Sequence, residues 1–462
     1  MAKKVTNKKV QNNASTSIAQ VFLKGDIWTK LSFLINGLSN IVRGQIIKGL
    51  LLLSMELGFL FYMITIGISS FAGLKTLGTE TQKKVFDEAK GIFIYKTGDN
   101  SMLILLLGVA TMFIMVGFFI IWNGSVKSAY ETQVLKEKGK RIPNAIDDFK
   151  SYFDKKLHVT LLFLPAAGII IFTILPLVFM ILIAFTNFDR THQPPGNLFT
   201  WVGFANFKVM LSSGNVLGKT FWPILGWTII WAIFSTFLNY IFGMLLAMLI
   251  NRKGTRLKGL WRIVFVLSIA VPQFVSLLVM RSMLQPGGAI NVLLRTIGVI
   301  GDTASLPFLT NGLWAKVTVI VINLWVGVPY TMLITTGILQ NIPSDLYESA
   351  KVDGANSFVT FVKITLPYML FVTTPYLITQ FISNINNFNV IFLLTQGAPN
   401  TLSYYQAGKT DLLVTWLYKL TTASFDYSYA AVIGILVFIL CGSISLITYR
   451  NTGSYKDEEG FQ

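Results

Sequence analysis

The chain has 462 residues, of which 53% are hydrophobic and 13% are charged. A soluble protein carries about a quarter charged residues, so this composition excludes an ordinary soluble domain. The formal net charge is +17, but the cations lie beside long apolar stretches, where contact with anionic membrane lipid explains them better than nucleic acid does. We therefore expect a protein that is embedded in a membrane, contacts its lipid and binds no nucleic acid.

The first 47 residues are basic and polar. Residues 1–47 are predicted to form a cytoplasmic N-terminal arm, in which 31–48 lies along the inner membrane surface as an amphipathic helix. The first thirty residues contain no compact apolar core and so do not resemble a cleaved signal peptide. The first span is therefore expected to act as an uncleaved anchor.

Eight apolar stretches are long enough to cross about 30 Å of hydrocarbon as helices. The first two, within 48–123, are followed by a charged cytoplasmic linker, 124–156, a six-helix core, 157–450, and a cytoplasmic tail, 451–462. The predicted fold is an all-α integral membrane protein with eight transmembrane helices, near 48–72, 101–123, 159–187, 222–250, 261–284, 314–340, 367–394 and 427–449.

Lysine and arginine are unevenly distributed among the connections between these spans. They are concentrated in the N-terminal arm, in the linker and in the short connection after the fourth span, which contains no acid. Such connections face the cytoplasm. Both termini are therefore predicted to lie in the cytoplasm, on the same side as the loop between the sixth and seventh spans.

The sequence offers no arrangement typical of a metal or catalytic site. The only cysteine, Cys441, lies within the last span, and the two histidines, His158 and His192, are far apart. Residues 213–220 approach a phosphate-binding loop, but they lack its first glycine and a preceding strand. The chain is therefore expected not to be an enzyme and to hold no cofactor or metal itself.

One polar loop, 343–367, interrupts the apolar core. Its anchor residues are Glu348-Ser349-Ala350, then Gly354 three residues later, then Ile364-Thr365-Leu366-Pro367 after nine more. The pattern predicts two short helices. Asp345 would cap the first, with Glu348 reaching back to it, Gly354 would close it, Asn356 or Ser357 would start the second, and Pro367 would end it. The alternative is a helical hairpin that serves packing alone.

Polar residues also recur inside two spans at i, i+4 and i+7: Asn323, Gly327 and Tyr330 in the sixth, and Gln380, Asn384 and Asn387 in the seventh. An unpaired amide costs several kcal/mol in hydrocarbon, so these two stripes must face each other, other helices or a wet cavity. They serve either as interhelical hydrogen bonds or as a pathway for an uncharged, hydroxyl-rich solute, because amides both donate and accept.

The spacing of the polar loop resembles the "EAA" signature of permease subunits of ATP-binding-cassette (ABC) importers, with Ser349 in place of the first alanine. From about Lys30 onward, the chain is similar to the larger permease subunit of maltose/maltodextrin importers, the MalF type, in segments that include 323–330 and 384–388. This resemblance implies the type I ABC importer permease fold in a bacterial cytoplasmic membrane. It also implies import of maltose/maltodextrin-like oligosaccharides.

The resemblance assigns roles to both sets of residues. It implies an ATPase-coupling loop that includes Glu348, Ala350, Asp353, Gly354, Ile364, Leu366 and Pro367. It implies a sugar site midway across the membrane that includes Asn323, Gly327, Tyr330, Gln380, Ser383, Asn384 and Asn387. The implied partners are a second, MalG-like permease, two ATPase subunits that bind the ATP and Mg, and an extracellular lipid-anchored or periplasmic sugar-binding protein.

Two departures leave the choice of sugar open. Ser383 and Ile269 stand where the family pattern has aromatic residues, and aromatic faces stack on sugar rings. Galacto- or arabinogalacto-oligosaccharides are therefore an alternative substrate class. An ion-coupled secondary transporter is an alternative of another class. It would need an acid at the middle of the membrane or a broken-helix ion site with inverted repeats, and neither is apparent. Glu56, in the first span, would serve an ion or proton relay in a functional interpretation. No second acid lies deep in another span to receive a proton, so Glu56 is expected either to be paired or to lie at the lipid interface.

Overall fold

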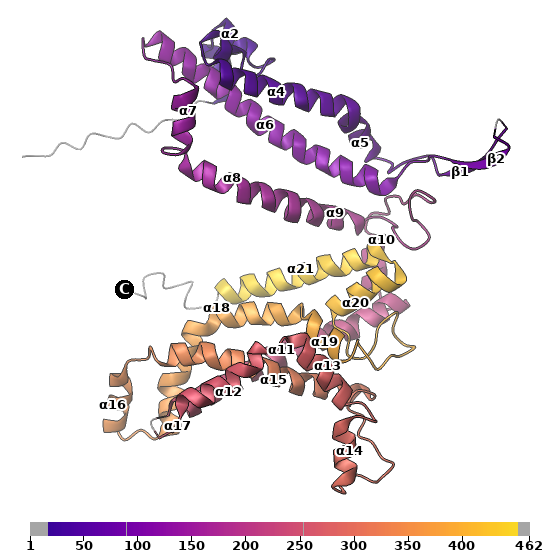
Figure 1. Ribbon diagram of the computed structural model, residues 1–462, viewed down its shortest axis with the longest axis vertical. Helices are drawn as coiled ribbons and strands as arrows, with labels where there is room; N and C mark the ends of the chain where they lie inside the picture. The colour runs from indigo at the N-terminus through magenta and orange to yellow at the C-terminus, as the bar shows by residue number, and fades with distance from the viewer. Residues whose placement is uncertain (1–16, 89, 253, 451–462) are drawn as a thin grey trace, which may run out of the picture. The chain divides into compact units, whose positions relative to one another are not determined.

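The computed structural model describes residues 17–88, 90–252 and 254–450, and the chain divides into two compact units (Figure 1). Unit 1 is the described part of Met1–Leu182 together with Thr191–Trp201. Unit 2 is Ile183–Arg190 together with the described part of Val202–Gln462. Helices dominate both units, as the apolar composition predicts.

Unit 1 contains the first three spans. The first runs over Ile46–Gly73 and lies beside the second, α6 (Ser101–Glu137), while the third covers Leu157–Ile183 (Figure 1). The predicted end of the second span, at 123, is too early, because the helix continues through a polar stretch rich in helix-forming residues. The elements are α1 (Ile18–Lys24), α2 (Ile27–Leu31), α3 (Leu38–Val42), α4 (Ile46–Tyr62), the π-helical turn Met63–Gly67, α5 (Ile68–Gly73), β1 (Lys83–Asp87), β2 (Ile92–Lys96), α6, α7 (Ala145–Tyr152), α8 (Leu157–Ile169), the π-helical turn Ile170–Ile174 and α9 (Leu175–Ile183).

The described part of the N-terminal arm packs against α6 through buried polar contacts. Arg43 is buried and pairs with both carboxylate oxygens of Asp26 at 2.7 and 2.8 Å, and it donates to the backbone oxygen of Ala129 at 2.7 Å. The predicted amphipathic helix over 31–48 is therefore wrong, because this segment breaks into short helices around the buried Arg43, which pairs with the more exposed Asp26. Glu56 accepts the backbone N–H of Asn36 at 2.7 Å, which agrees with the first of its two expected roles, a pairing within the protein.

A two-stranded antiparallel hairpin between the first and second spans qualifies the all-α prediction. β1 pairs with β2 from Lys83 opposite Lys96 to Asp87 opposite Ile92. It extends beyond the ends of α5 and α6 (Figure 1). Phe86 and Phe93 face each other at a centroid distance of 5.1 Å. β2 is rich in β-branched and aromatic residues, which favour strands, but neither strand alternates apolar and polar residues, so the sequence gave no clear signal.

Unit 2 is built around the long helix α11, which packs against α15 and α18. Trp227 and Trp231 of α11 are buried, and their indole N–H groups donate to the backbone oxygens of Thr410 and Asn384, both at 3.1 Å. These bonds hold the loop before α20 and the C-terminal end of α18 against α11. The elements are α10 (Ala205–Leu211), α11 (Val216–Asn251), α12 (Lys258–Ala270), α13 (Gln273–Met283), α14 (Ala289–Thr296), α15 (Gly312–Leu339), α16 (Ser344–Val352), α17 (Ser357–Thr360), the π-helical turn Phe361–Thr365, α18 (Leu366–Ile385), α19 (Phe388–Leu394), α20 (Leu413–Lys419), the π-helical turn Leu420–Ser424 and α21 (Tyr427–Arg450).

Two predicted continuous spans are broken. The fifth consists of α12 and α13, which meet at an angle of 86°. Val271 is extended there because Pro272 disfavours the helical conformation in the residue before it. The seventh begins earlier than predicted, at Ser357, and is interrupted between Ile385 and Phe388. Seven helices of the described chain are long and apolar enough to span a membrane, and the bent pair makes an eighth if it is one span.

Candidate functional site

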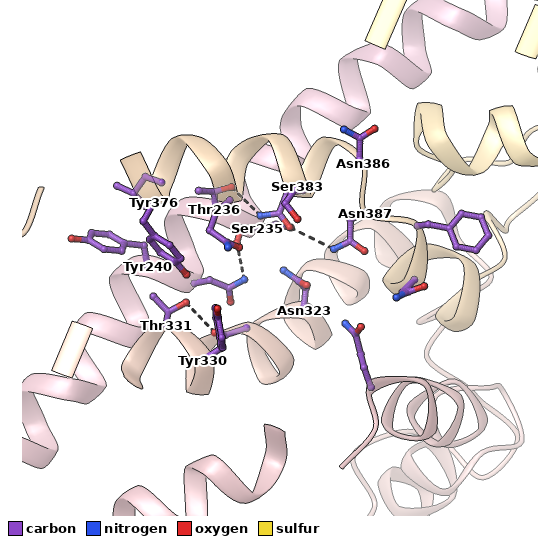
Figure 2. Close-up of a pocket in the computed structure, with 18 residues that line it drawn as sticks. Ser235, Thr236, Tyr240, Asn323, Tyr330, Thr331, Tyr376, Ser383, Asn386 and Asn387 are labelled. Atoms are coloured by element: carbon purple, nitrogen blue, oxygen red, sulfur yellow. Dashed lines mark hydrogen bonds between the residues drawn. The ribbon is translucent and has the colours of Figure 1, made fainter. Parts of the chain in front are cut away.

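A cavity of about 380 Å³ lies within unit 2, where α11, α15 and α18 meet the break before α19 (Figure 2). Its wall consists mainly of hydroxyl groups and side-chain amides, and none of the described residues that line it is charged. They are Ser235, Thr236, Asn239, Tyr240, Gln273, Asn323, Gly327, Tyr330, Thr331, Tyr376, Leu377, Gln380, Ser383, Asn384, Asn386, Asn387, Phe388 and Asn389. The cavity therefore offers many hydrogen bonds without a formal charge.

All seven residues predicted to contact a solute line this cavity, so the stripes of the sixth and seventh spans do face each other. One part of the prediction is wrong. Asn387 does not share a helical face with Asn384, because α18 ends at Ile385 and Asn387 caps α19 by accepting the N–H of Val390 at 3.2 Å. Asn387 reaches the cavity from the break between two helices.

Some of the amides also hold the cavity wall together. Asn384 donates from Nδ2 to Thr236 Oγ1 at 3.0 Å, and its Oδ1 lies 3.5 Å from Asn387 Nδ2 (Figure 2). Asn239 donates to the backbone oxygen of Ser235 at 2.6 Å. These contacts are interhelical and intrahelical bonds of the kind that the packing alternative requires. Binding of a solute by Asn384 and Asn387 stays a prediction.

The contribution of α11 was missed by the sequence analysis. Ser235, Thr236, Asn239 and Tyr240 form one polar face near the middle of this helix, and all four are buried. Their spacing, two adjacent pairs four residues apart, is the same helical signal that marked the other two stripes. Gln273 was also missed, because it reaches the cavity only by virtue of the bend before α13.

Aromatic side chains enter the cavity from three positions besides the predicted Tyr330. Together with Tyr330, the side chains of Tyr240, Tyr376 and Phe388 line it from four helices. The Tyr240 hydroxyl lies 2.7 Å from Thr373 Oγ1, which fixes its ring, while Tyr330 is half exposed. The absence of an aromatic residue at Ser383 therefore does not leave the cavity without rings on which a sugar could stack.

The polar loop forms the predicted pair of short helices, α16 and α17. Gly354 follows α16 with φ +75°, and the N–H groups of Gly354 and Ala355 donate to the oxygens of Lys351 and Ala350 at 3.1 and 2.9 Å. This pair of bonds is the Schellman arrangement that a left-handed glycine permits. Asn356 caps α17 by accepting the N–H of Val359 at 2.8 Å. Both features agree with the predicted roles of these residues.

Two details of the loop differ from the prediction. Asp345 is not a cap: α16 begins at Ser344 after Pro343, and Asp345 lies in its first turn, where a negative charge still favours the helix N-terminus. Pro367 does not end the second helix. It follows the π-helical turn Phe361–Thr365, and α18 continues beyond it to Ile385. The wider backbone of the π-helical turn tolerates the hydrogen bond that is missing because proline has no N–H.

The residues predicted to couple to an ATPase divide by exposure. Glu348, Asp353, Gly354 and Pro367 are exposed, Ile364 and Leu366 are half-buried, and Ala350 is buried. Two apolar neighbours are strongly exposed, Val352 at 87% and Phe358 at 72%. Exposed apolar side chains on a short polar loop are typical of a docking surface rather than of a connection that serves packing alone.

Comparison with known proteins identifies the family. Residues 239–452 match the family model described as "binding-protein-dependent transport system inner membrane component". The maltodextrin transport system permease protein MdxF of Bacillus subtilis is 34% identical, over 92% of this chain and 95% of that protein. The chain belongs to this family of ABC transporter permeases. It is thus a membrane protein, and the matched residues include every cavity-lining residue except Ser235 and Thr236.

Other relatives place this permease among those of sugar importers. The galactooligosaccharides transport system permease protein GanP of Bacillus subtilis is 32% identical, over 92% of this chain and 97% of that protein. The maltose/maltodextrin permease MalF of Escherichia coli is 35% identical, over 58% of this chain and 52% of that protein. A solved bacterial ABC transporter for alginate import shares the permease fold, with a TM-score of 0.51 at 22% identity over 66% of this chain and 99% of that one.

Proposed function

We propose that this permease subunit carries neutral oligosaccharides of the maltose/maltodextrin type across the bacterial cell membrane. The cavity is the observation that supports this most strongly. Its volume of about 380 Å³ falls within the usual range of small-molecule sites, about 300–1,000 Å³. Its amides and hydroxyls match the donors and acceptors of sugar hydroxyls.

The uncharged wall favours a neutral sugar over an acidic one. Anionic sugars would call for lysine or arginine at the site, and the described lining residues contain neither. The solved alginate importer, described as taking up an acidic polysaccharide, is similar in fold only. MdxF and GanP, whose names refer to maltodextrin and galactooligosaccharides, are much more similar in sequence, and they define the preferred substrate and its runner-up.

The chain would work within a larger complex. It would pair with a MalG-like second permease, receive sugar from an extracellular lipid-anchored or periplasmic binding protein, and dock two ATPase subunits, which bind ATP and Mg. The loop 343–367 would transmit ATPase closure through the exposed Val352 and Phe358 and the Gly354 turn. ATP hydrolysis would then belong to the partners and not to this chain.

Competitive uptake tests the proposed substrate. The chain would be expressed with its neighbouring transporter subunits in cells that lack their own maltodextrin and galacto-oligosaccharide importers. We expect uptake of labelled maltotriose that unlabelled maltodextrins inhibit more strongly than galacto-oligosaccharides do. The reverse order would make the runner-up correct. Uptake of neither would contradict the oligosaccharide proposal.

The same cells test the energy source. An ion-coupled transporter would stop on addition of an ionophore that collapses ion gradients while ATP is maintained, whereas an ABC importer would continue. The broken helices of unit 2 make this test worthwhile, because such breaks also occur in secondary transporters. Membership of the ABC permease family predicts that uptake follows ATP.

The proposed orientation, with both termini in the cytoplasm, is tested by labelling single cysteines in a Cys441→Ser background. Val352 and Leu402 are suitable positions because their side chains are almost fully exposed, at 87% and 105%. A membrane-impermeant thiol reagent should label Leu402→Cys in intact cells and Val352→Cys only after lysis. The opposite pattern would place the coupling loop beyond the reach of an ATPase.

A further inference from the structure

One corner of the cavity combines polar residues of α11 and α15. Ser235 and Asn239 lie one turn apart on α11, and Asn239 packs against Gly327, which lies one turn from Asn323 on α15 (Figure 2). All three polar side chains are at least nine-tenths buried, with exposures of 1% for Ser235, 9% for Asn239 and 4% for Asn323. They therefore cannot satisfy their hydrogen bonds in bulk water.

Each of these residues has a buried atom without a hydrogen-bond partner among the described residues: Ser235 Oγ, Asn239 Oδ1 and Asn323 Nδ2. The orientation of the Asn239 amide follows from chemistry, because its other end lies 2.6 Å from the backbone oxygen of Ser235, which can only accept. The corner therefore presents an acceptor, a donor and a hydroxyl. Leaving a buried polar atom unpaired costs about 1–3 kcal/mol, so hydrogen bonds from the hydroxyl groups of a ligand to this set would be favourable.

We propose that Ser235 and Asn239 bind the transported sugar and, with Asn323, form a subsite for two adjacent hydroxyl groups. One sugar hydroxyl would donate to Asn239 Oδ1 and accept from Asn323 Nδ2, and its neighbour would pair with Ser235 Oγ. This inference rests on the proposed function and extends it, because it adds α11 to the substrate-contacting helices. A solute with a single hydroxyl would leave at least one of the three atoms unpaired.

Gly327 acts as a positioning residue for this subsite. A Cβ built at Gly327 would run into the side-chain amide of Asn239. Only glycine lets α15 approach α11 closely enough for Asn239 and Asn323 to share one hydroxyl group. Gly327→Ala should therefore weaken sugar binding by displacing Asn239, and this loss should largely disappear in an Asn239→Ala background, where the two changes act on the same contact.

The test separates binding from folding. Ser235→Ala and Asn239→Leu would be made in the full chain, purified with its partner subunits, and compared for melting temperature without sugar and for maltotriose affinity by titration calorimetry. Removing an unpaired buried polar atom does not destabilise the empty protein. We therefore expect the Ser235→Ala complex to melt at the same temperature as the wild type or higher. It should bind maltotriose about five-fold more weakly, because it loses one hydrogen bond to the sugar. Asn239→Leu should weaken binding further.

Thr228→Val serves as the control on the same helix. Thr228 is also buried, but its hydroxyl is satisfied, because it donates to the backbone oxygen of Ile224 at 2.8 Å and accepts the N–H of Leu413 at 3.1 Å. This variant should melt at a lower temperature and keep its maltotriose affinity. If Ser235→Ala and Asn239→Leu behave like Thr228→Val, the subsite is refuted. If the wild-type complex binds no oligosaccharide at all, the proposed function itself fails.

Discussion

The spans of unit 1 and the central spans of unit 2 are all apolar, but they bury different shares of their residues. In the most apolar stretch of each of the first three spans, only 11%, 22% and 6% of the residues are buried within the chain. The corresponding shares are 44% in α11 and 33% in α15. The first three spans thus bury little of their surface within unit 1, whereas α11 and α15 pack against each other.

The buried polar residues show the same division. In unit 1 they gather where the N-terminal arm meets α6, around the Arg43–Asp26 ion pair, and they hold the arm in place. In unit 2 they lie near the middle of α11 and α15 and face a cavity. The polar residues of unit 1 therefore anchor the chain, whereas those stacked along the middle of several spans of unit 2 line the cavity that we propose as the route of the solute.

The largest expected effect comes from the coupling loop. Gly354→Val places a branched side chain in a left-handed conformation, which costs about 1–2 kcal/mol in a residue other than glycine. We expect the turn between α16 and α17 to change shape and sugar uptake to fall at least about ten-fold, with normal membrane insertion. Uptake and sugar-stimulated ATPase activity would be measured in the same membranes.

Gly139→Val is the matched control in unit 1. Gly139 also has a positive φ, +63° against +75° at Gly354, and a Cβ at either position would meet no atom within 4 Å. The local strain is therefore comparable, but Gly139 follows α6, outside the proposed coupling loop. Uptake should remain close to that of the wild type. Equal losses in both variants, or none in Gly354→Val, would contradict the coupling role.

A smaller effect is expected in the cavity. Asn384→Leu removes an amide predicted to bind sugar. That amide also donates to the Thr236 hydroxyl at 3.0 Å, and Thr236→Val removes this packing contact while it leaves the amide in place. If Asn384 and Asn387 bind sugar, Asn384→Leu and Asn387→Leu should each reduce uptake several-fold or shift the preference between two competing oligosaccharides, with normal complex yield. Lower yield with an unchanged preference would support the packing alternative. Thr111→Val, which breaks a contact to Tyr62 in unit 1, should affect yield alone.

The sequence predicted the spans, the loop and six cavity residues because each leaves a local pattern, and the family resemblance added Ser383. Apolar length marks a span, and helical spacing marks a polar face. The breaks were missed because apolar periodicity continues across them. Pro272 did indicate one of them, because a proline restricts the residue before it, here Val271. The polar face of α11 has the same helical spacing at Ser235 and Asn239. It was missed because no loop motif lies beside that span.

The ion pair of unit 1 could not have been predicted in the same way. Arg43 contributes one more cation to a basic arm, and counting charges assigns it to the membrane surface. Its burial depends on Asp26, seventeen positions earlier in the chain, and on carbonyl and hydroxyl groups of α6 about ninety positions later. Such long-range pairing leaves no periodic trace. The predicted surface helix failed for this reason.

The smallest effect on transport is expected from that ion pair. Burial alone raises the pKa of Asp26, but hydrogen bonds from Arg43 and Thr29 outweigh it and hold the pKa below its ordinary value. The carboxylate therefore stabilises unit 1 above the unfolded pKa, near 3.9, and this contribution is lost as the pH falls through the folded pKa. Asp26→Asn should remove it at neutral pH and leave the buried Arg43 without its counterion. Because Asp26 is 42% exposed and solvent screens the pair, we expect stability to fall by about 1–3 kcal/mol, less than the roughly 3–5 kcal/mol expected for a fully buried pair.

Limited proteolysis of the N-terminal segment at neutral pH, alongside sugar uptake, would measure both consequences of this substitution. Cleavage should speed up while uptake stays within about two-fold of the wild type, because the cavity of unit 2 keeps all its own contacts. Asp148→Asn is the matched control. Its pair with Lys48, at 3.5 Å between partly exposed side chains, contributes about 0–1 kcal/mol and should leave cleavage nearly unchanged. A loss of uptake as large as that of Asn384→Leu would show that unit 1 takes part in transport, and the functional division between the two units would then be wrong.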